Sequence, residues 1–203
     1  MNPELLFTRH ARELDAEMRA VVPAEPAGLF DMVRYHLGWV DEQGRPACAK
    51  AGKQLRPTLC LLCCEATGGD YRRALPAAAA LELLHNRALF RLAGRGIAPP
   101  LALVAADYLD QATLALCAGQ YLDMAFEARP EVATAEYFAM VKGKTAALMG
   151  CATAIGALLG SGEEAVATAY QRFGESLGVA FQIQDDILGI WGDPQVTGQP
   201  AAD

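Results

Sequence analysis

The chain has 203 residues, of which 53% are hydrophobic and 20% charged, a composition typical of a globular protein with a buried core rather than of a disordered one. Its formal net charge of −7 argues against general nucleic-acid binding, because such proteins need a basic surface to displace counterions. An anionic ligand would therefore need a local basic pocket, a metal bridge, or both.

Hydrophobic residues recur at helical spacing along almost the whole chain, and no sustained alternation typical of strands occurs. The expected helices lie near residues 3–20, 27–39, 54–67, 72–93, 100–128, 134–159 and 163–191. GGD at 68–70, GRG at 94–96 and SG at 161–162 mark breaks between them. We therefore predict one all-α domain over residues 1–203, built as a bundle of long helices.

The N-terminal stretch MNPELLFTRHARELDAEM is charged throughout and lacks the apolar core of a signal peptide. Residues 145–162 come nearest to a membrane span, since they carry no charge and reach the lower length limit. They are rich in Ala, Gly and Thr and have no flanking Trp or Tyr. We interpret them as a buried helix, and we expect no transmembrane segment and a cytoplasmic location.

The six cysteines include a C-x-x-C pair, Cys60 and Cys63, which would suit a redox or zinc site in another context. The pair lies within an expected helix, however, and Cys48, Cys117 and Cys151 are too scattered to complete a zinc site. We expect the cysteines to be small core residues of a protein in a reducing compartment.

Two segments contain basic residues that could contact a phosphate group. AGKQLRP, residues 51–57, places Lys53 and Arg56 three positions apart, and VKGKTAAL places Lys144 beside Thr145. In AGKQLRP the free N–H groups of a first helical turn add positive potential, and VKGKTAAL offers similar phosphate-binding groups ahead of a run of small residues. A solvated first turn is the alternative for AGKQLRP, and that segment alone leaves both interpretations open.

Polar residues also interrupt two apolar helices. His85 closes the run ALELLH, where a lone histidine is more often a core residue than a ligand. Gln120 and Asp123 in GQYLD lie at positions i and i+3 and so share one helical face. Each of these signals is weak when taken alone.

The stretch FQIQDDILGIWGDP, residues 181–194, places two adjacent carboxylates in an otherwise apolar run. Gln182, Asp185 and Asp186 fall on one helical face. Two carboxylates suit Mg²⁺, and phosphate oxygens can complete the coordination shell of the ion. A salt-bridged structural pair is the alternative, but the scarcity of basic residues nearby favours the metal.

Together these segments resemble the trans-isoprenyl diphosphate synthases, also called polyprenyl synthetases. The resemblance rests on GKQLRP with CCEATGGD, AALELLH, LALCAGQYLDMAFE, KTAALMGCA and FQIQDDILGIWGDPQVTG, of which the last looks like the family's second aspartate-rich motif. It implies an isoprenoid-synthase-type helical bundle that acts as a prenyltransferase. Such an enzyme joins isopentenyl diphosphate to an allylic diphosphate, with Mg²⁺ as cofactor and a homodimer as the usual assembly.

The resemblance also implies a role for each matching residue. Substrate-binding positions for isopentenyl diphosphate match Lys53, Arg56 and His85, and polar positions lining the site match Gln120 and Asp123. Catalytic positions facing the allylic diphosphate match Lys144, Thr145 and Gln182, and the Mg²⁺ ligands match Asp185 and Asp186. The implied mechanism ionises the allylic carbon–oxygen bond, releasing diphosphate, and the cation adds to the double bond of isopentenyl diphosphate, after which a proton leaves.

The sequence departs from the family where a first aspartate-rich motif should follow ELLH. There it reads NRALFRLAGRGIAPP, without an acidic residue, as though a stretch had been cut out. Gln54 and Gln199 also replace a usual Arg and Lys, and Gly189 replaces the third aspartate of the second motif. The sequence stops at Asp203, before the family's C-terminal helices, and a chain without them is expected to expose apolar surface or to be covered by a partner.

Three interpretations follow. The sequence at hand omits segments of an ordinary synthase; or the protein is a non-catalytic relative that binds prenyl diphosphates or regulates a synthase; or it is a structural helical module. The third leaves the polar set unexplained. A terpene cyclase would share the fold and metal chemistry, but GKQLRP paired with FQIQDD favours the chain-elongating branch. We therefore predict a prenyltransferase that is active only if the real chain contains the first aspartate-rich motif.

Overall fold

The computed structural model describes residues 8–23, 28–47, 54–83 and 86–192. Within these ranges the chain is helical apart from turns and an isolated β-bridge between Val40 and Pro46, so the all-α prediction is confirmed. The elements in order are α2 (Ala11–Arg19), α3 (Gly28–His36), α4 (Leu55–Ala66), α5 (Tyr71–Leu83), η1 (Asn86–Arg95), α6 (Pro99–Phe126), α7 (Thr134–Val141), η2 (Lys142–Ala146), α8 (Ala147–Ser161) and α9 (Glu164–Trp191).

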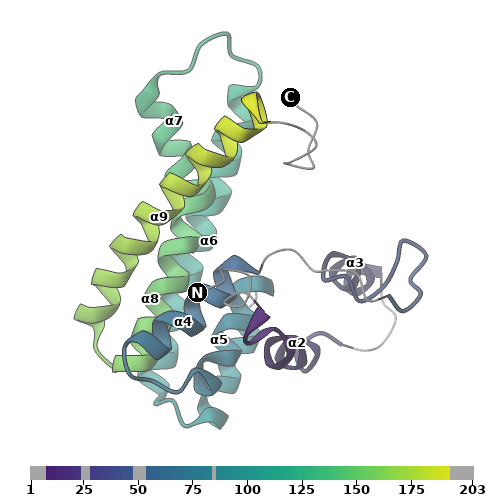
Figure 1. Ribbon diagram of the computed structural model, residues 1–203, viewed down its shortest axis with the longest axis vertical. Coiled ribbons are helices and arrows are strands. Elements are labelled where there is room, and N and C mark those ends of the chain that lie inside the picture. Colours follow the sequence, from purple (N-terminus) through teal and green to yellow (C-terminus); the bar gives the residue numbers. More distant parts are fainter. Residues whose placement is uncertain (1–7, 24–27, 48–53, 84–85, 193–203) are drawn as a thin grey trace.

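Helix α8 is the centre of the bundle. Every residue from Leu148 to Leu159 is buried, with α4, α5, α6 and α9 packed around the helix. Figure 1 shows α6, α8 and α9 along the long axis, with α4 and α5 toward one end and α2 and α3 beside them. The interpretation of residues 145–162 as a buried helix is therefore confirmed.

In the described part of the chain, two helical stretches are long and apolar enough to cross a membrane by length and composition alone. Thr134–Ser161 is one of them, and 72% of its most apolar window is buried in the molecule, as expected of a core helix. Pro99–Phe126 is the other, with 17% of its window buried. It carries Gln120 and Asp123 near its C-terminal end.

Two expected helices change geometry along their length. The helix predicted over 72–93 ends as α5 at Leu83, and η1 continues as a 3₁₀ helix. The buried Leu89 and Leu92 are three positions apart, and such residues eclipse one another in a 3₁₀ helix. The helix predicted over 134–159 is divided by the π-helical turn η2. Hydrophobic periodicity does not distinguish these geometries from an α-helix.

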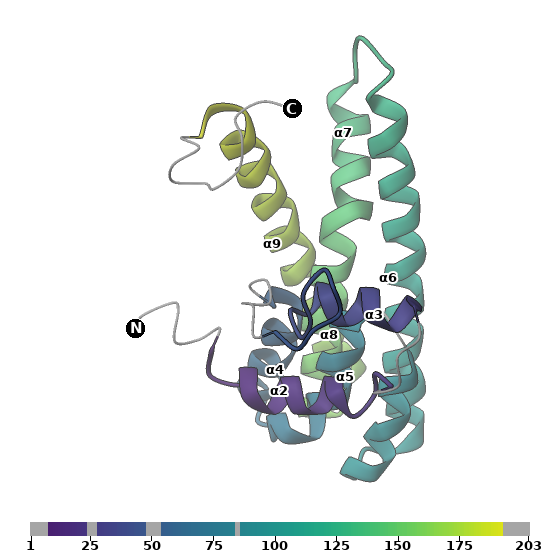
Figure 2. The same cartoon turned by 90° about the vertical axis from the view of Figure 1, so that its right-hand side faces the viewer.

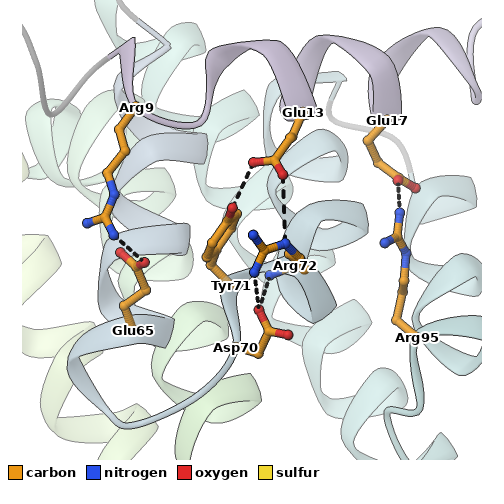
Figure 3. A network of polar contacts seen from close by, with 8 residues as sticks. All are labelled: Arg9, Glu13, Glu17, Glu65, Asp70, Tyr71, Arg72 and Arg95. Carbon is orange, nitrogen blue, oxygen red and sulfur yellow. Dashed lines mark hydrogen bonds and ion pairs between the residues drawn. The ribbon is translucent and has the colours of Figure 1, made fainter.

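Acidic residues of α2 attach this helix to the bundle through a polar network (Figure 3). Glu13 accepts a hydrogen bond of 2.8 Å from the Tyr71 hydroxyl. Glu17 is only 4% exposed, and its two carboxylate oxygens pair with Arg91 at 2.5 Å and Arg95 at 2.6 Å. Both arginines belong to η1, the segment that stands where the first aspartate-rich motif was expected.

The described cysteines are core residues as predicted, except Cys117 of α6, for which the prediction is wrong. Cys60, Cys63, Cys64 and Cys151 are free and buried, and Cys117 is free and exposed. Burial raises the pKa of Cys63 to about 11 and that of Cys151 to about 12, so these thiols stay protonated at neutral pH. Cys48 lies outside the described residues.

Most of the exposed large apolar side chains of the described residues lie on two helices, α6 and α9. Leu103, Leu114, Tyr121 and Met124 are more than half exposed along α6. The exposed residues of α9 include Phe173, Phe181, Ile187, Leu188, Ile190 and Trp191. Exposed apolar surface of this extent is typical of a face that contacts another molecule or segment.

Candidate functional site

A pocket of about 390 Å³ lies among the start of α4, the end of α5, η2, α8 and α9. Three predicted site residues, Arg56, Lys144 and Thr145, line it although they are far apart in sequence. The remaining lining residues are His36, Gln54, Leu55, Glu82, Leu148, Met149 and Phe181. The pocket therefore combines two cationic groups with an apolar wall, a combination that suits a ligand with an anionic head and an apolar body.

Helix α4 presents its N-terminus at this pocket. Gln54 is its N-terminal cap residue and adopts a left-handed conformation with φ 43°, which is uncommon for a residue other than glycine. Arg56 follows in the first turn and lies 3.7 Å from the Glu82 carboxylate of α5. Because Glu82 is only 11% exposed, it restrains the Arg56 guanidinium at the pocket wall. The unpaired N–H groups of this first turn add positive potential on the same side.

Lys144 and Thr145 lie in the π-helical turn η2, which packs very closely against α6. A Cβ atom on Gly119 would lie 2.1 Å from the backbone nitrogen of Lys144, so no larger residue fits between the two backbones. Asp123 follows one turn after Gly119, and its Oδ2 atom accepts a 2.5 Å hydrogen bond from Lys144 Nζ. Gln120 donates a weaker bond of 3.4 Å to the same oxygen. Short π-helical turns of this kind occur frequently at functional sites.

Helix α9 approaches η2 and α8 through two glycines. A Cβ atom on Gly178 would lie 2.6 Å from Ala146 Cα, and Gly174 makes a similar approach to Met149 and Thr153. This contact places Gln182, one turn beyond Gly178, within hydrogen-bonding distance of Thr145. The Thr145 hydroxyl donates to Gln182 Oε1, and Gln182 Nε2 donates to Asp186 Oδ1 at 2.8 Å. A chain of hydrogen bonds thus runs from the pocket wall to the predicted metal ligand.

Tyr137 on α7 is a member of the site that the sequence analysis missed. Its hydroxyl donates to Asp186 Oδ2 at 2.5 Å. Burial, the hydrogen bond to Asp186 and the charge of that carboxylate raise the pKa of Tyr137 to about 12, so the hydroxyl remains a donor at neutral pH. Its position seven residues before Lys144, two helical turns away, is the sequence signal that could have identified it.

The two adjacent carboxylates have different surroundings. Both oxygens of Asp186 accept a hydrogen bond, whereas Asp185 is exposed and has no side-chain partner within residues 8–23, 28–47, 54–83 and 86–192. Among those residues no group of three or more His, Cys, Asp and Glu side chains is placed to hold a metal. Mg²⁺ is commonly held by one or two carboxylates, with substrate phosphates and water completing its shell. The donor set therefore fits Mg²⁺ that binds together with a phosphate-bearing ligand.

The structure brings most of the predicted site residues together. Arg56, Lys144 and Thr145 share the pocket, and the remaining described members, Gln120, Asp123, Gln182 and Asp186, are connected to them by hydrogen bonds. Asp185 is adjacent to Asp186 on α9. Lys53 and His85 lie outside the described residues, and their predicted roles remain predictions.

Comparison with known proteins places the chain in a family. The sequence model of the polyprenyl synthetase family matches residues 100–203, which is half of the chain. The chain therefore belongs to the polyprenyl synthetase family, as the resemblance of its motifs predicted.

Individual relatives agree with this assignment. A (2E,6E)-farnesyl diphosphate synthase of Mycobacterium bovis is 37% identical over 94% of this chain and 60% of its own length. A geranylgeranyl diphosphate synthase of Mycobacterium tuberculosis is also 37% identical, over 85% of this chain and 60% of its own length. The crystal structure of a polyprenyl synthetase from Streptomyces coelicolor A3(2) superposes with a TM-score of 0.86 at 32% identity, covering 97% of this chain and 69% of that one.

The chain spans about 60% of the length of the two mycobacterial relatives. The alignment with the Mycobacterium bovis synthase extends over 227 positions, more than the 203 residues of this chain. That relative consequently has residues inside the aligned region that have no counterpart here. That a gap falls directly after ELLH stays a prediction.

Proposed function

We propose that this protein is a prenyltransferase of isoprenoid biosynthesis that condenses isopentenyl diphosphate with an allylic diphosphate. One observation carries the proposal: Arg56, Lys144 and Thr145 line a single pocket that is linked through Gln182 to Asp186. Membership of the polyprenyl synthetase family and the similarity to named synthases support it. Because those relatives are synthases, they favour this activity over a non-catalytic diphosphate-binding or regulatory role.

In the proposed reaction the chain's own residues bind and orient the two diphosphates. Arg56 holds isopentenyl diphosphate. Lys53 and His85, which lie outside the described residues, are predicted to hold the same substrate. Its guanidinium can grip a phosphate through two donors. Lys144 and Thr145 face the allylic diphosphate and supply an ammonium and a hydroxyl group where negative charge grows as the carbon–oxygen bond opens. Gln182 orients the Thr145 hydroxyl by accepting its hydrogen bond.

We further propose Mg²⁺ as the cofactor, held by Asp185 and Asp186. Bound Mg²⁺ would neutralise the diphosphate and stabilise it as a leaving group. The exposed Asp185 and the doubly hydrogen-bonded Asp186 support this assignment, since both carboxylates keep lone pairs that can face a cation. Asp123 is too closely engaged with Lys144 to serve the same purpose without breaking that ion pair.

We also propose that the chain is one all-α domain that works in the cytoplasm as a homodimer, without a transmembrane segment and without a nucleic-acid partner. The burial of Thr134–Ser161 supports the absence of a membrane span in that stretch. The exposed apolar side chains of α6 and α9 provide surface that a second copy could cover. The net charge of −7 disfavours nucleic acid.

An elongation assay tests the proposed activity. The full chain is incubated with radiolabelled isopentenyl diphosphate and either geranyl or farnesyl diphosphate, in Mg²⁺ or in excess EDTA, and the extracted prenyl products are resolved by chain length. The proposal predicts a longer prenyl diphosphate in Mg²⁺ and none in EDTA. If the protein binds the allylic diphosphate but forms no elongated product in Mg²⁺, the protein is a non-catalytic prenyl-diphosphate-binding relative.

A further inference from the structure

Asp186 is held by donors from two different helices, and this arrangement leaves its carboxylate little freedom to rotate. Gln182 belongs to α9 itself, one turn before Asp186, and donates to Oδ1. Tyr137 comes from α7 and donates to Oδ2 at 2.5 Å. A carboxylate oxygen has two lone pairs, so each oxygen of Asp186 keeps one for a cation. The two hydrogen bonds therefore fix the plane of the carboxylate and leave one lone pair on each oxygen free.

Tyr137 is itself fixed in position from several sides. The Glu136 carboxylate accepts the Ala133 N–H at 3.0 Å and pairs with Arg129 at 2.7 Å, which anchors the first turn of α7. The Tyr137 ring packs edge-on against Phe138, with 5.7 Å between ring centroids. In Figure 2 the C-terminal part of α9 leans away from α7. The Tyr137–Asp186 hydrogen bond joins the two helices. Tyr137 thus links the anchored helix to the carboxylate.

We infer that Tyr137 is a positioning residue of the magnesium site, which orients Asp186 toward the metal by hydrogen bonding to its second oxygen. The inference rests on the proposed function, because it needs Asp186 to be a metal ligand. Hydrogen-bond partners of metal-binding carboxylates set the direction of their free lone pairs, and their loss weakens metal affinity. Asp185 has no comparable restraint in the described part of the chain, so Asp186 is the preorganised member of the pair.

The test separates metal-dependent from metal-independent ligand binding. Calorimetry measures the affinity of the full chain for geranyl thiolodiphosphate, an unreactive allylic diphosphate analogue, once in Mg²⁺ and once in EDTA. Tyr137→Phe removes only the hydroxyl. It should lower the affinity in Mg²⁺ by about tenfold and leave the affinity in EDTA unchanged. Tyr121→Phe is the matched control, since Tyr121 is 72% exposed on α6 and should behave as the wild type in both conditions.

Three results would overturn the inference. If the wild type gains affinity from Mg²⁺ and Tyr137→Phe gains as much, the hydroxyl does not orient a metal ligand, although the proposed function stands. If Tyr137→Phe loses affinity equally in Mg²⁺ and EDTA, its role is structural. If the wild type itself gains nothing from Mg²⁺, the proposed magnesium site is wrong and the inference falls with it.

Discussion

Lys144 Nζ lies 2.5 Å from Asp123 Oδ2, so the ammonium group proposed to face a diphosphate is already paired with a carboxylate. Both side chains are partly exposed, 31% for Lys144 and 27% for Asp123. The pair fixes the position of the lysine, but it also offsets charge that a phosphate would otherwise meet. Asp123 therefore has two opposite effects on phosphate binding: it positions Lys144, and it weakens the attraction of Lys144 for a phosphate.

Asp123→Asn should separate these two effects. Removing the negative charge should tighten binding of inorganic pyrophosphate in EDTA by up to about fivefold, the range expected for a partly exposed ion pair. It should also lower the elongation rate, because Lys144 loses the partner that orients it. Calorimetry and the elongation assay measure the two quantities. Asp107→Asn, on the exposed side of α6, is the control, and weaker pyrophosphate binding by Asp123→Asn alone would contradict the prediction.

Gly119 should tolerate no larger residue. In Gly119→Ala the new methyl group would lie 2.1 Å from the Lys144 backbone nitrogen, so α6 and η2 must separate. We expect a loss of about 1–3 kcal/mol in the free energy of unfolding, measured by urea denaturation. Gly189→Ala is the control, because nothing lies within 4 Å of its Cβ position and alanine favours helix there. Equal stability of Gly119→Ala and wild type would show that the two backbones are not in direct contact.

The buried carboxylate of Glu17 should matter more than its exposed neighbour. Glu17→Gln leaves Arg91 and Arg95 without their charged partner, and we expect it to lower the free energy of unfolding by about 2–3 kcal/mol. Glu13→Gln removes a carboxylate whose side chain is 43% exposed, and it should change stability by less than about 1 kcal/mol. Urea denaturation of the two variants gives the comparison. A larger loss in Glu13→Gln would contradict the structure.

The buried thiol of Cys151 should make the free energy of unfolding fall as the pH rises above 9. Its pKa rises from 9.0 in the unfolded chain to about 12 in the fold because burial disfavours the thiolate. The stabilising contribution is therefore complete below pH 9 and is lost as the pH rises toward 12. Cys151→Ala should show a shallower loss of stability over that window. In the native protein at pH 8 a thiol reagent should modify Cys117 quickly and Cys151 only on unfolding, so rapid labelling of Cys151 would refute the buried site.

Contacts between residues close in sequence could be predicted, whereas contacts between distant segments could not. The spacing of Gln182, Asp185 and Asp186 determines a helical face by itself, and the structure joins Gln182 to Asp186 as expected. Tyr137 was missed because its partner lies 49 positions away and their contact depends on how α7 packs near α9. Glu82 and His36 were missed for the same reason, since only the tertiary fold brings them to the pocket.

The fold shows the same division. Apolar spacing predicted α4, α6 and α9 to within a few residues, because a long amphipathic or buried helix has a strong period. It did not predict that η1 is a 3₁₀ helix or that η2 is a π-helical turn. The second depends on the close approach of Gly119 to Gly143, a contact between elements that no local pattern encodes.

In the pocket that Arg56, Lys144 and Thr145 line, we propose that Lys144 and Thr145 face the allylic diphosphate, and one binding measurement tests this assignment most directly. Calorimetry compares geranyl thiolodiphosphate binding in Mg²⁺ by the wild type, Lys144→Ala and Lys142→Ala, the last changing an exposed lysine two residues away. We predict that Lys144→Ala weakens binding by at least about tenfold, since it loses a charged hydrogen bond, and that Lys142→Ala matches the wild type. Equal affinities for all three proteins would contradict the account and place the diphosphate elsewhere.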